Sequence, residues 1–194
     1  MPHRNYYLDV CVTAFIVHRN KVMLGIHQKS QQMLPPGGHL EDGETFEHAL
    51  LREVFEETNM PVHILQPPGF PAFRDEHATQ CVPPVFVDYH RVNEHHMHQA
   101  LCYLCRPDEH RQARPHFAQS AEFRELDFYS AEQIDDMFHN ENPAKIMPSV
   151  RQYCLTALEL AKTHTEFGPP SPSPLFSKTE KTIRQLDSDL VDTN

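Results

Sequence analysis

The chain has 194 residues, of which 39% are apolar and 23% are charged, a balance typical of one globular domain with a core of its own. Its formal net charge of -10, with 17 Lys and Arg residues that form no obvious basic footprint, argues against broad nucleic-acid binding and against binding to anionic membranes. The longest apolar run, at residues 10–17, is too short to span a bilayer, and residues 1–7 show no secretory signal, so we expect a cytoplasmic protein.

The N-terminal part of the chain is predicted to contain a β-hairpin followed by a glycine-rich loop. Two β-rich segments are separated by Arg19 and Asn20, which offer a turn. Three of the six glycines lie between residues 37 and 43, so backbone freedom is concentrated there. The predicted elements are strands at residues 9–17 and 21–26, a loop at residues 34–38, a short strand at residues 39–41 and a turn at residues 42–43.

A helix is predicted at residues 46–58. Thr45 is a good N-cap, the segment contains no Gly or Pro, and Pro61 stops the helix. At about 100° per residue, Glu53 and Glu57 lie one turn apart on an apolar face. The apolar residues of that face are Phe46, Ala49 and Leu50, and a second apolar flank is formed by Leu51, Val54 and Phe55. Two carboxylates therefore stand where core residues are expected.

Adjacent buried carboxylates are costly unless one of them takes up a proton or a cation lies between them. Ligands that are all oxygen, at this density, suit a hard ion such as Mg²⁺ or Mn²⁺. The alternative is a solvated acidic helix end on which Arg52 and Glu56 form a surface pair. The charge pattern of the helix alone leaves both interpretations open.

Beyond the helix, strands are followed by two more helices, which predicts an α/β fold. Ser130 is a plausible N-cap for a short helix that ends near Met137, and an apolar stripe between residues 150 and 161 predicts a helix that packs on the sheet. The predicted strands are residues 62–66, 85–92, 99–104 and 123–128, with a Pro-rich loop at residues 67–80 that is long enough to shape a substrate pocket.

The composition changes near the C-terminus, where residues 168–174 read GPPSPSP and form a stiff, extended linker. We therefore expect one domain at residues 1–167, followed by a flexible tail at residues 168–194. No internal repeat is visible.

The five cysteines are odd in number and scattered, which is not the pattern of a disulfide framework and fits a reducing compartment. Cys102 and Cys105 lie in a predicted strand, where residues three apart point to opposite faces, so we expect buried thiols rather than a zinc or redox pair. His95, His96 and His98 are interpreted as part of a polar loop before that strand, although adventitious binding of Zn²⁺ or Ni²⁺ there is chemically reasonable.

The spacing of polar residues at positions 38–60 resembles the signature of the Nudix hydrolases. The matching residues are Gly38, Glu44, Arg52, Glu53, Val54, Glu56, Glu57 and Met60. Asn59 stands where the family has Gly, and Asn tolerates the left-handed conformation that ends a helix, so the departure leaves the metal site intact. The resemblance implies an α/β/α sandwich with a mixed central sheet.

The resemblance also implies a reaction, namely hydrolysis of the diphosphate bond in a nucleoside diphosphate linked to another moiety, by water that attacks phosphorus with the help of Mg²⁺ or Mn²⁺. Arg52 would hold the helix carboxylates in place, and Glu44 would tie the loop to the helix. The implied metal ligands are Glu53, Glu57, Glu56 directly or through water, and the backbone carbonyl of Gly37.

The group that takes the proton from that water is open, since family members use either a Glu of the signature, such as Glu53 or Glu56, or an acid of a later loop. Glu122 and Glu125 are the late candidates, with Glu122 preferred for its position in a loop, and ordinary surface roles are the alternative for both. The residues that flank the glycine loop are His27, Lys29 and His39, which could contact phosphates or a base or have surface roles.

Two alternatives to a hydrolase remain open. One is a Nudix-fold module that binds a nucleotide without turnover, against which the intact Glu53, Glu56 and Glu57 count. The other is an acidic protein whose helix only resembles the signature. No further signature names the substrate beyond a small nucleotide, and a homodimer is left open because members of the family often dimerise.

Overall fold

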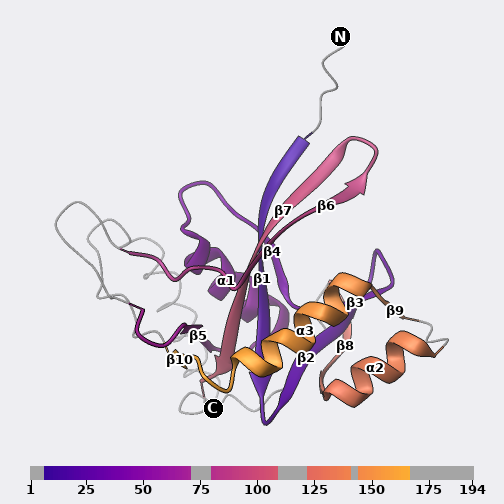
Figure 1. Cartoon of the computed structure of the whole chain (residues 1–194). Coiled ribbons are helices and arrows are strands. Elements are labelled where there is room, and N and C mark those ends of the chain that lie inside the picture. The colour runs from indigo at the N-terminus through magenta and orange to yellow at the C-terminus, as the bar shows by residue number, and fades with distance from the viewer. Residues whose placement is uncertain (1–6, 71–79, 109–121, 141–143, 167–194) are drawn as a thin grey trace, which may run out of the picture.

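The structure is a computed structural model that describes residues 7–70, 80–108, 122–140 and 144–166 (Figure 1). The predicted loop at residues 67–80 is therefore described only at its two ends, and the predicted tail at residues 168–194 lies outside the described residues. The strands are β1 (Tyr7–His18), β2 (Lys21–His27), β3 (Gln32–Leu34), β4 (Gly37–His39), β5 (Val62–Gln66), β6 (Phe86–Asn93), β7 (His96–Pro107), β8 (Phe123–Tyr129), β9 (Lys145–Ile146) and β10 (Thr165–Glu166). The helices are α1 (Phe46–Thr58), α2 (Ala131–His139) and α3 (Pro148–Leu160).

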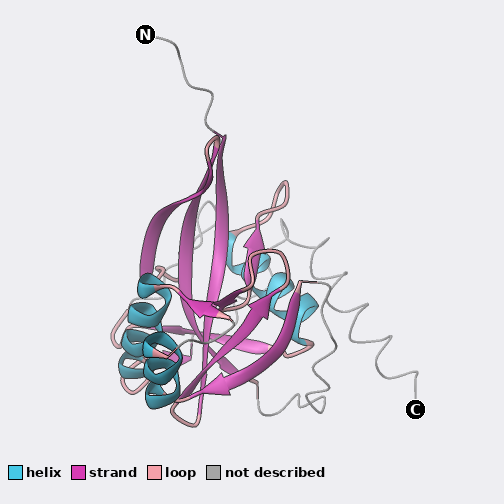
Figure 2. Cartoon of the chain, turned by 90° about the vertical axis from the view of Figure 1, so that its right-hand side faces the viewer, coloured by secondary structure: helices cyan, strands magenta, loops and turns pink. Residues whose placement is uncertain are grey.

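The strands form a mixed sheet with helices on both sides (Figure 2). The central strand β1 pairs in parallel with β7 and antiparallel with β2 and β4. Helix α1 packs on one face through a core that includes Leu50 and Val54, and α2 and α3 pack on the other through Ile134 and Leu158. The predicted α/β/α sandwich with a mixed sheet is thus confirmed.

Strand β1 contributes to both cores because successive side chains of a strand point to opposite faces. Its residues Val12, Ala14 and Ile16 pack with α1, and Cys11, Phe15 and Val17 pack with the core under α3. Burial of each large side chain stabilises the fold by about 1.5–3 kcal/mol, which explains why this strand reads as a nearly continuous apolar run.

The predicted β-hairpin is confirmed. Arg19 and Asn20 both have positive φ, at 48° and 58°, in a two-residue turn between the paired His18 and Lys21. A two-residue turn with positive φ at both positions matches the twist of the flanking strands, and Asn adopts this conformation more readily than most residues.

Two predicted boundaries are wrong. The short strand expected at residues 39–41 lies at Gly37–His39, because β4 pairs with β1 from Gly37 onward. His96 and His98, expected in a loop, belong to β7, because β7 begins at His96 and pairs there with both β1 and β6. The polar residues at the start of β7 give only a weak strand signal in the sequence. In the fold this segment is a strand because its backbone pairs with both β1 and β6.

The two cysteines of the CxxC pattern lie on opposite faces of β7, as predicted, since Cys102 belongs to the core under α3 and Cys105 to the core under α1. Both thiols are buried and free. Within the described part of the chain, the helices are too short or too polar for any of them to cross a membrane.

Candidate active site

Helix α1 carries the residues of the signature and is capped at both ends. The hydroxyl of Thr45 accepts a hydrogen bond from the His48 N–H (3.3 Å), which satisfies one of the free donors of the first turn. At the other end, Asn59 adopts the left-handed conformation (φ 52°, ψ 30°), and its N–H donates to the Phe55 carbonyl (2.8 Å). Asn59 therefore replaces the expected Gly without a change of backbone geometry.

Two glycines allow strand β4 to lie close to both β1 and α1. A Cβ atom on Gly37, whose φ is +149°, would lie 2.1 Å from the carbonyl oxygen of Val12 in β1. A Cβ atom on Gly38 would lie 2.5 Å from the carboxylate of Glu53. A side chain at Gly37 would therefore separate β4 from β1, and a side chain at Gly38 would displace the carboxylate of Glu53.

The carboxylate of Glu57 is buried and only half satisfied. Its Oε2 atom accepts a hydrogen bond from the N–H of Gly37 (2.8 Å), whereas its Oε1 atom is buried and has no hydrogen-bond donor among the described residues. Burial, assisted by the charges of Glu53 and Glu122, raises the pKa of Glu57 to about 8 against the opposing effect of the Gly37 hydrogen bond. An unpartnered anionic oxygen beside other carboxylates is an arrangement that a cation would compensate.

The carboxylate of Glu53 lies beside this group and is half-buried. Burial raises its pKa, and the charges of Glu56 and Glu122 act in the same direction, although Arg52 opposes them. Glu56, one turn from Arg52, is exposed, and its Oε2 atom lies 3.3 Å from Arg52 Nη1. The signature residues of the helix thus include one buried, one half-buried and one exposed carboxylate.

The guanidinium of Arg52 joins the helix to the loop that precedes it. Its Nε and Nη2 atoms donate to the two carboxylate oxygens of Glu44 (2.8 and 2.9 Å), and Nη1 donates to Glu53 Oε1 (2.9 Å). Nη2 also donates to the carbonyl of His39 (3.0 Å). The planar fork of Arg fits such a bidentate contact, and no other side chain offers five donors in this geometry.

Replacing Arg52 by Ala is expected to lower the free energy of unfolding by about 2–3 kcal/mol, because the side chain of Glu44 is only 9% exposed and would lose its cation. Arg52→Lys keeps the charge but not the fork, so about half of that loss is expected. Urea unfolding at pH 7 measures both. A loss below about 0.5 kcal/mol for Arg52→Ala would show instead an ordinary surface pair.

Glu122 lies near the helix carboxylates, whereas Glu125 is placed differently. The carbonyl of Glu122 accepts a hydrogen bond from the Gln28 N–H (2.8 Å), and its charge contributes to the raised pKa of both Glu53 and Glu57. Glu125 has a positive φ of 55° at an irregularity of β8, and it faces solvent.

The flanking candidates for substrate contact separate into two groups. His27, at the end of β2, packs against the ring of Phe123 with centroids 5.5 Å apart, and burial lowers its pKa although Glu122 acts in the opposite direction. Lys29 is exposed in the turn that follows β2. The side chain of His39 lies elsewhere, because it points to the sheet face opposite to that of Gly38, which faces Glu53.

The structure also brings together residues that the sequence did not associate. His39 lies beside Asp9, His96 and His98, and the four ligand atoms are within 4.8 Å of one another. The alternation of His96 and His98 in a strand was the available signal, since it places both on one face. The participation of Asp9 depends on the parallel register of β1 and β7, which pairs Asp9 with His98.

The chain matches the family model of the NUDIX domain over residues 8–150. The solved structure of a hydrolase of the NUDIX family from Clostridium perfringens has 26% identity and a TM-score of 0.60, over 82% of this chain and 99% of that chain. A NUDIX hydrolase from Nitrosomonas europaea has 17% identity and a TM-score of 0.57, over 86% and 98% of the two chains. A MutT NUDIX hydrolase from Burkholderia pseudomallei has 17% identity and a TM-score of 0.55, over 79% and 98%, so these two show the fold alone.

The chain therefore belongs to the Nudix family and is a Nudix-type hydrolase. Its activity is of the general class that acts on nucleoside diphosphates linked to another group, and hydrolases of this family act on small nucleotide substrates. Enzymes of this family generally need a divalent metal ion. The residues present fit such an ion, because the half-satisfied carboxylate of Glu57 lies next to further oxygen donors.

Proposed function

We propose that this chain hydrolyses the diphosphate bond of a nucleoside diphosphate linked to another moiety, in a reaction that depends on Mg²⁺ or Mn²⁺. The observation that supports this proposal is the buried Oε1 atom of Glu57, which has no partner among the residues that the structure describes and lies in a cluster of carboxylates. A hard divalent ion is the partner that an all-oxygen site of this charge favours.

Glu53, Glu56 and Glu57, with the backbone carbonyl of Gly37, would hold the ion. When bound, the ion neutralises phosphate oxygens and lowers the pKa of a coordinated water. The chain positions these ligands in advance, since Arg52 donates to Glu53 and Glu56 and the N–H of Gly37 donates to Glu57. Little reorganisation is then needed when substrate binds.

Glu122 is proposed as the general base. In the reaction the water oxygen forms a bond to phosphorus, the bond from phosphorus to the leaving phosphate oxygen breaks, and the carboxylate of Glu122 accepts the proton of the water. Its charge contributes to the raised pKa of Glu53 and of Glu57, which supports a position within electrostatic range of the proposed ligands. His27 and Lys29, in the neighbouring turn, are the proposed contacts for substrate phosphates or base.

Hydrolysis of a panel of nucleotides is expected to require Mg²⁺ or Mn²⁺ and to cease when EDTA removes the metal. The panel comprises nucleoside triphosphates, nucleotide sugars and capped or triphosphorylated RNA ends, each assayed by phosphate release and product analysis. Activity that persists at full rate in excess EDTA would contradict the metal-dependent mechanism. Metal-dependent nucleotide binding with no product from any substrate would favour the binding-module alternative.

Substituting Glu122 by Gln is expected to reduce kcat by about 10²-fold or more, because a general base contributes about 10²–10⁴-fold to the rate. Glu125→Gln is the matched control, since it makes the same change at another exposed position, within β8, and its kcat is expected to stay within about twofold. Steady-state kinetics at saturating Mg²⁺ measure both. A decrease smaller than about tenfold for Glu122→Gln would assign the base to another carboxylate, with Glu53 and Glu56 next to be tested.

A further inference from the structure

A second group of metal-ligating side chains lies outside the α1 carboxylates. It consists of Asp9 on β1, His39 on β4, and His96 and His98 on β7, and is called here the imidazole cluster. We propose that the imidazole cluster is a binding site for Zn²⁺, chemically and spatially separate from the site for Mg²⁺ or Mn²⁺.

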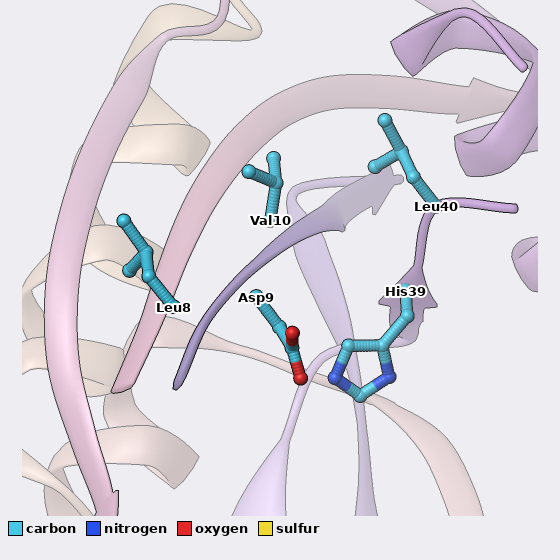
Figure 3. A pocket seen from close by; sticks show the side chains of 5 residues that line it. All are labelled: Leu8, Asp9, Val10, His39 and Leu40. Atoms are coloured by element: carbon cyan, nitrogen blue, oxygen red, sulfur yellow. The ribbon is translucent and has the colours of Figure 1, made fainter. Parts of the chain in front are cut away.

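The sheet brings these four residues to one face. Strands β4, β1 and β7 are neighbours, with His39 paired to Cys11 and Asp9 paired to His98. Asp9 and Cys11 are two residues apart, as are His96 and His98, so each pair shares a face. Figure 3 shows the carboxylate of Asp9 and the imidazole of His39 pointing to the same side.

The distances within the imidazole cluster are close to those that a tetrahedral ion requires. His39 Nε2 lies 3.1 Å from His98 Nε2, and His96 Nε2 lies 2.8 Å from Asp9 Oδ2. Ligand atoms at about 2.0–2.1 Å from a tetrahedral Zn²⁺ are about 3.3 Å apart. No two of the four ligand atoms are more than 4.8 Å apart, so the widest separation must close by at most about 1.5 Å, which small side-chain rotations of the exposed Asp9 and His39 can achieve.

The donor set selects the kind of ion. Three imidazoles and one carboxylate match the nitrogen-rich ligand sets of Zn²⁺, whereas Mg²⁺ and Mn²⁺ prefer oxygen. The carboxylate of Asp9 would supply one negative charge.

The imidazole cluster is open to an incoming ion, because the side chains of Asp9 and His39 are exposed. An adjoining surface hollow of about 300 Å³ is lined by Asp9 and His39, and by Leu8, Val10 and Leu40, whose side chains point to the other side of the strands (Figure 3). The backbone of His39 links the cluster to the α1 site, since its carbonyl accepts a hydrogen bond from Arg52. The side chains of the two sites are on opposite sides of β4.

Calorimetric titration with Zn²⁺ tests the proposal. The chain of 194 residues is first stripped of bound metal and then saturated with Mg²⁺ before Zn²⁺ is added. One tight site is expected in the wild type, and its affinity is expected to fall by about 100-fold or more in His98→Ala and in His96→Ala, since even outer-shell changes cost about 10–100-fold. His95→Ala is the matched control, because His95 lies in the adjacent turn outside the imidazole cluster, and its affinity should equal that of the wild type.

Two further measurements identify the site. Co²⁺ bound in place of Zn²⁺ is expected to give the intense visible absorption of a tetrahedral ion, and this absorption should be lost in His98→Ala and in Asp9→Asn. Glu57→Gln, which removes a proposed Mg²⁺ ligand, should retain the wild-type Zn²⁺ affinity, so failure of one site is distinguishable from failure of the other. Wild-type affinity in both His96→Ala and His98→Ala, or equal weakening in His95→Ala, would overturn the proposal.

Discussion

Glu57→Gln is expected to reduce metal-dependent turnover by about 10³-fold or more, because the substitution removes the anionic oxygen that would bind the metal ion. The variant keeps the size of the side chain and can still accept the hydrogen bond from Gly37. Steady-state kinetics at saturating Mg²⁺ measure the loss. Turnover within about tenfold of the wild type would remove Glu57 from the proposed ligand set.

The same substitution should change how stability depends on pH in the metal-free protein. The pKa of Glu57 is raised from its ordinary value of 4.5 to about 8, so the folded state holds this proton more tightly than the unfolded chain does. Its contribution to stability is therefore complete below about pH 4.5 and is lost as the pH rises to about 8, by at most about 1.4 kcal/mol per pH unit. Glu57→Gln, which is neutral throughout, should lack this contribution.

Urea unfolding in EDTA at pH 5.5 and pH 8 isolates the contribution as the difference between the wild type and Glu57→Gln. Glu125→Gln is the matched control, since it removes an exposed carboxylate that lies outside the carboxylate cluster of α1. At pH 8, saturating Mg²⁺ should stabilise the wild type more than Glu57→Gln, because the variant lacks one anionic ligand of the ion. Identical pH slopes in the wild type and Glu57→Gln would contradict the assignment of the raised pKa.

Gly37→Ala is the second substitution with a large expected effect. Its Cβ atom would lie 2.1 Å from the Val12 carbonyl oxygen, at a φ of +149° that a side chain rarely adopts, so β4 would have to move away from β1. That movement would also displace the Gly37 N–H from Glu57. We expect the free energy of unfolding to fall by about 2–4 kcal/mol and kcat to fall by about 10²-fold, through strain and lost positioning.

Gly43→Ala is the control for backbone strain. Gly43 also has a positive φ, +86°, but a Cβ atom there would meet nothing within 4 Å. Its cost should be only that of the unusual backbone conformation, about 1 kcal/mol, with kcat almost unchanged. Thermal unfolding and steady-state kinetics on both variants separate the two effects. Equal losses in both variants would show that the close contact with Val12 is not what makes Gly37 necessary.

Helix α1 and its chemistry could be read from sequence because the signals are local. The cap at Thr45, the left-handed end at Asn59 and the common face of Glu53 and Glu57 all depend on residues within a few turns of one helix. Phe46 is the exception on that face, since it is 36% exposed, while Ala49 and Leu50 are fully buried. The first turn of α1 is therefore less covered by the sheet than the turns that follow it.

The surroundings of α1 could be read only in part. The spacing of the signature anticipated that Arg52 holds the helix carboxylates, but its hydrogen bond to the His39 carbonyl depends on where β4 ends. Glu122 and Glu125 look alike in sequence but have different neighbours in the structure. The turn after β2 contacts Glu122, whose carbonyl accepts a hydrogen bond from the Gln28 N–H. Which of two nearby acids approaches a site is decided by the packing of distant segments.

The pattern of residues 38–60 was thus sufficient for the family, the general reaction and the composition of the carboxylate site, since a helix repeats its geometry every few residues. The imidazole cluster shows the complementary case. Asp9 and His98 are far apart in the chain and meet only because β1 and β7 pair in parallel, and a shift of one residue in that register would send each side chain to the other face. Strand register depends on long-range pairing and on both packed cores, so the folded chain was needed to reveal this cluster.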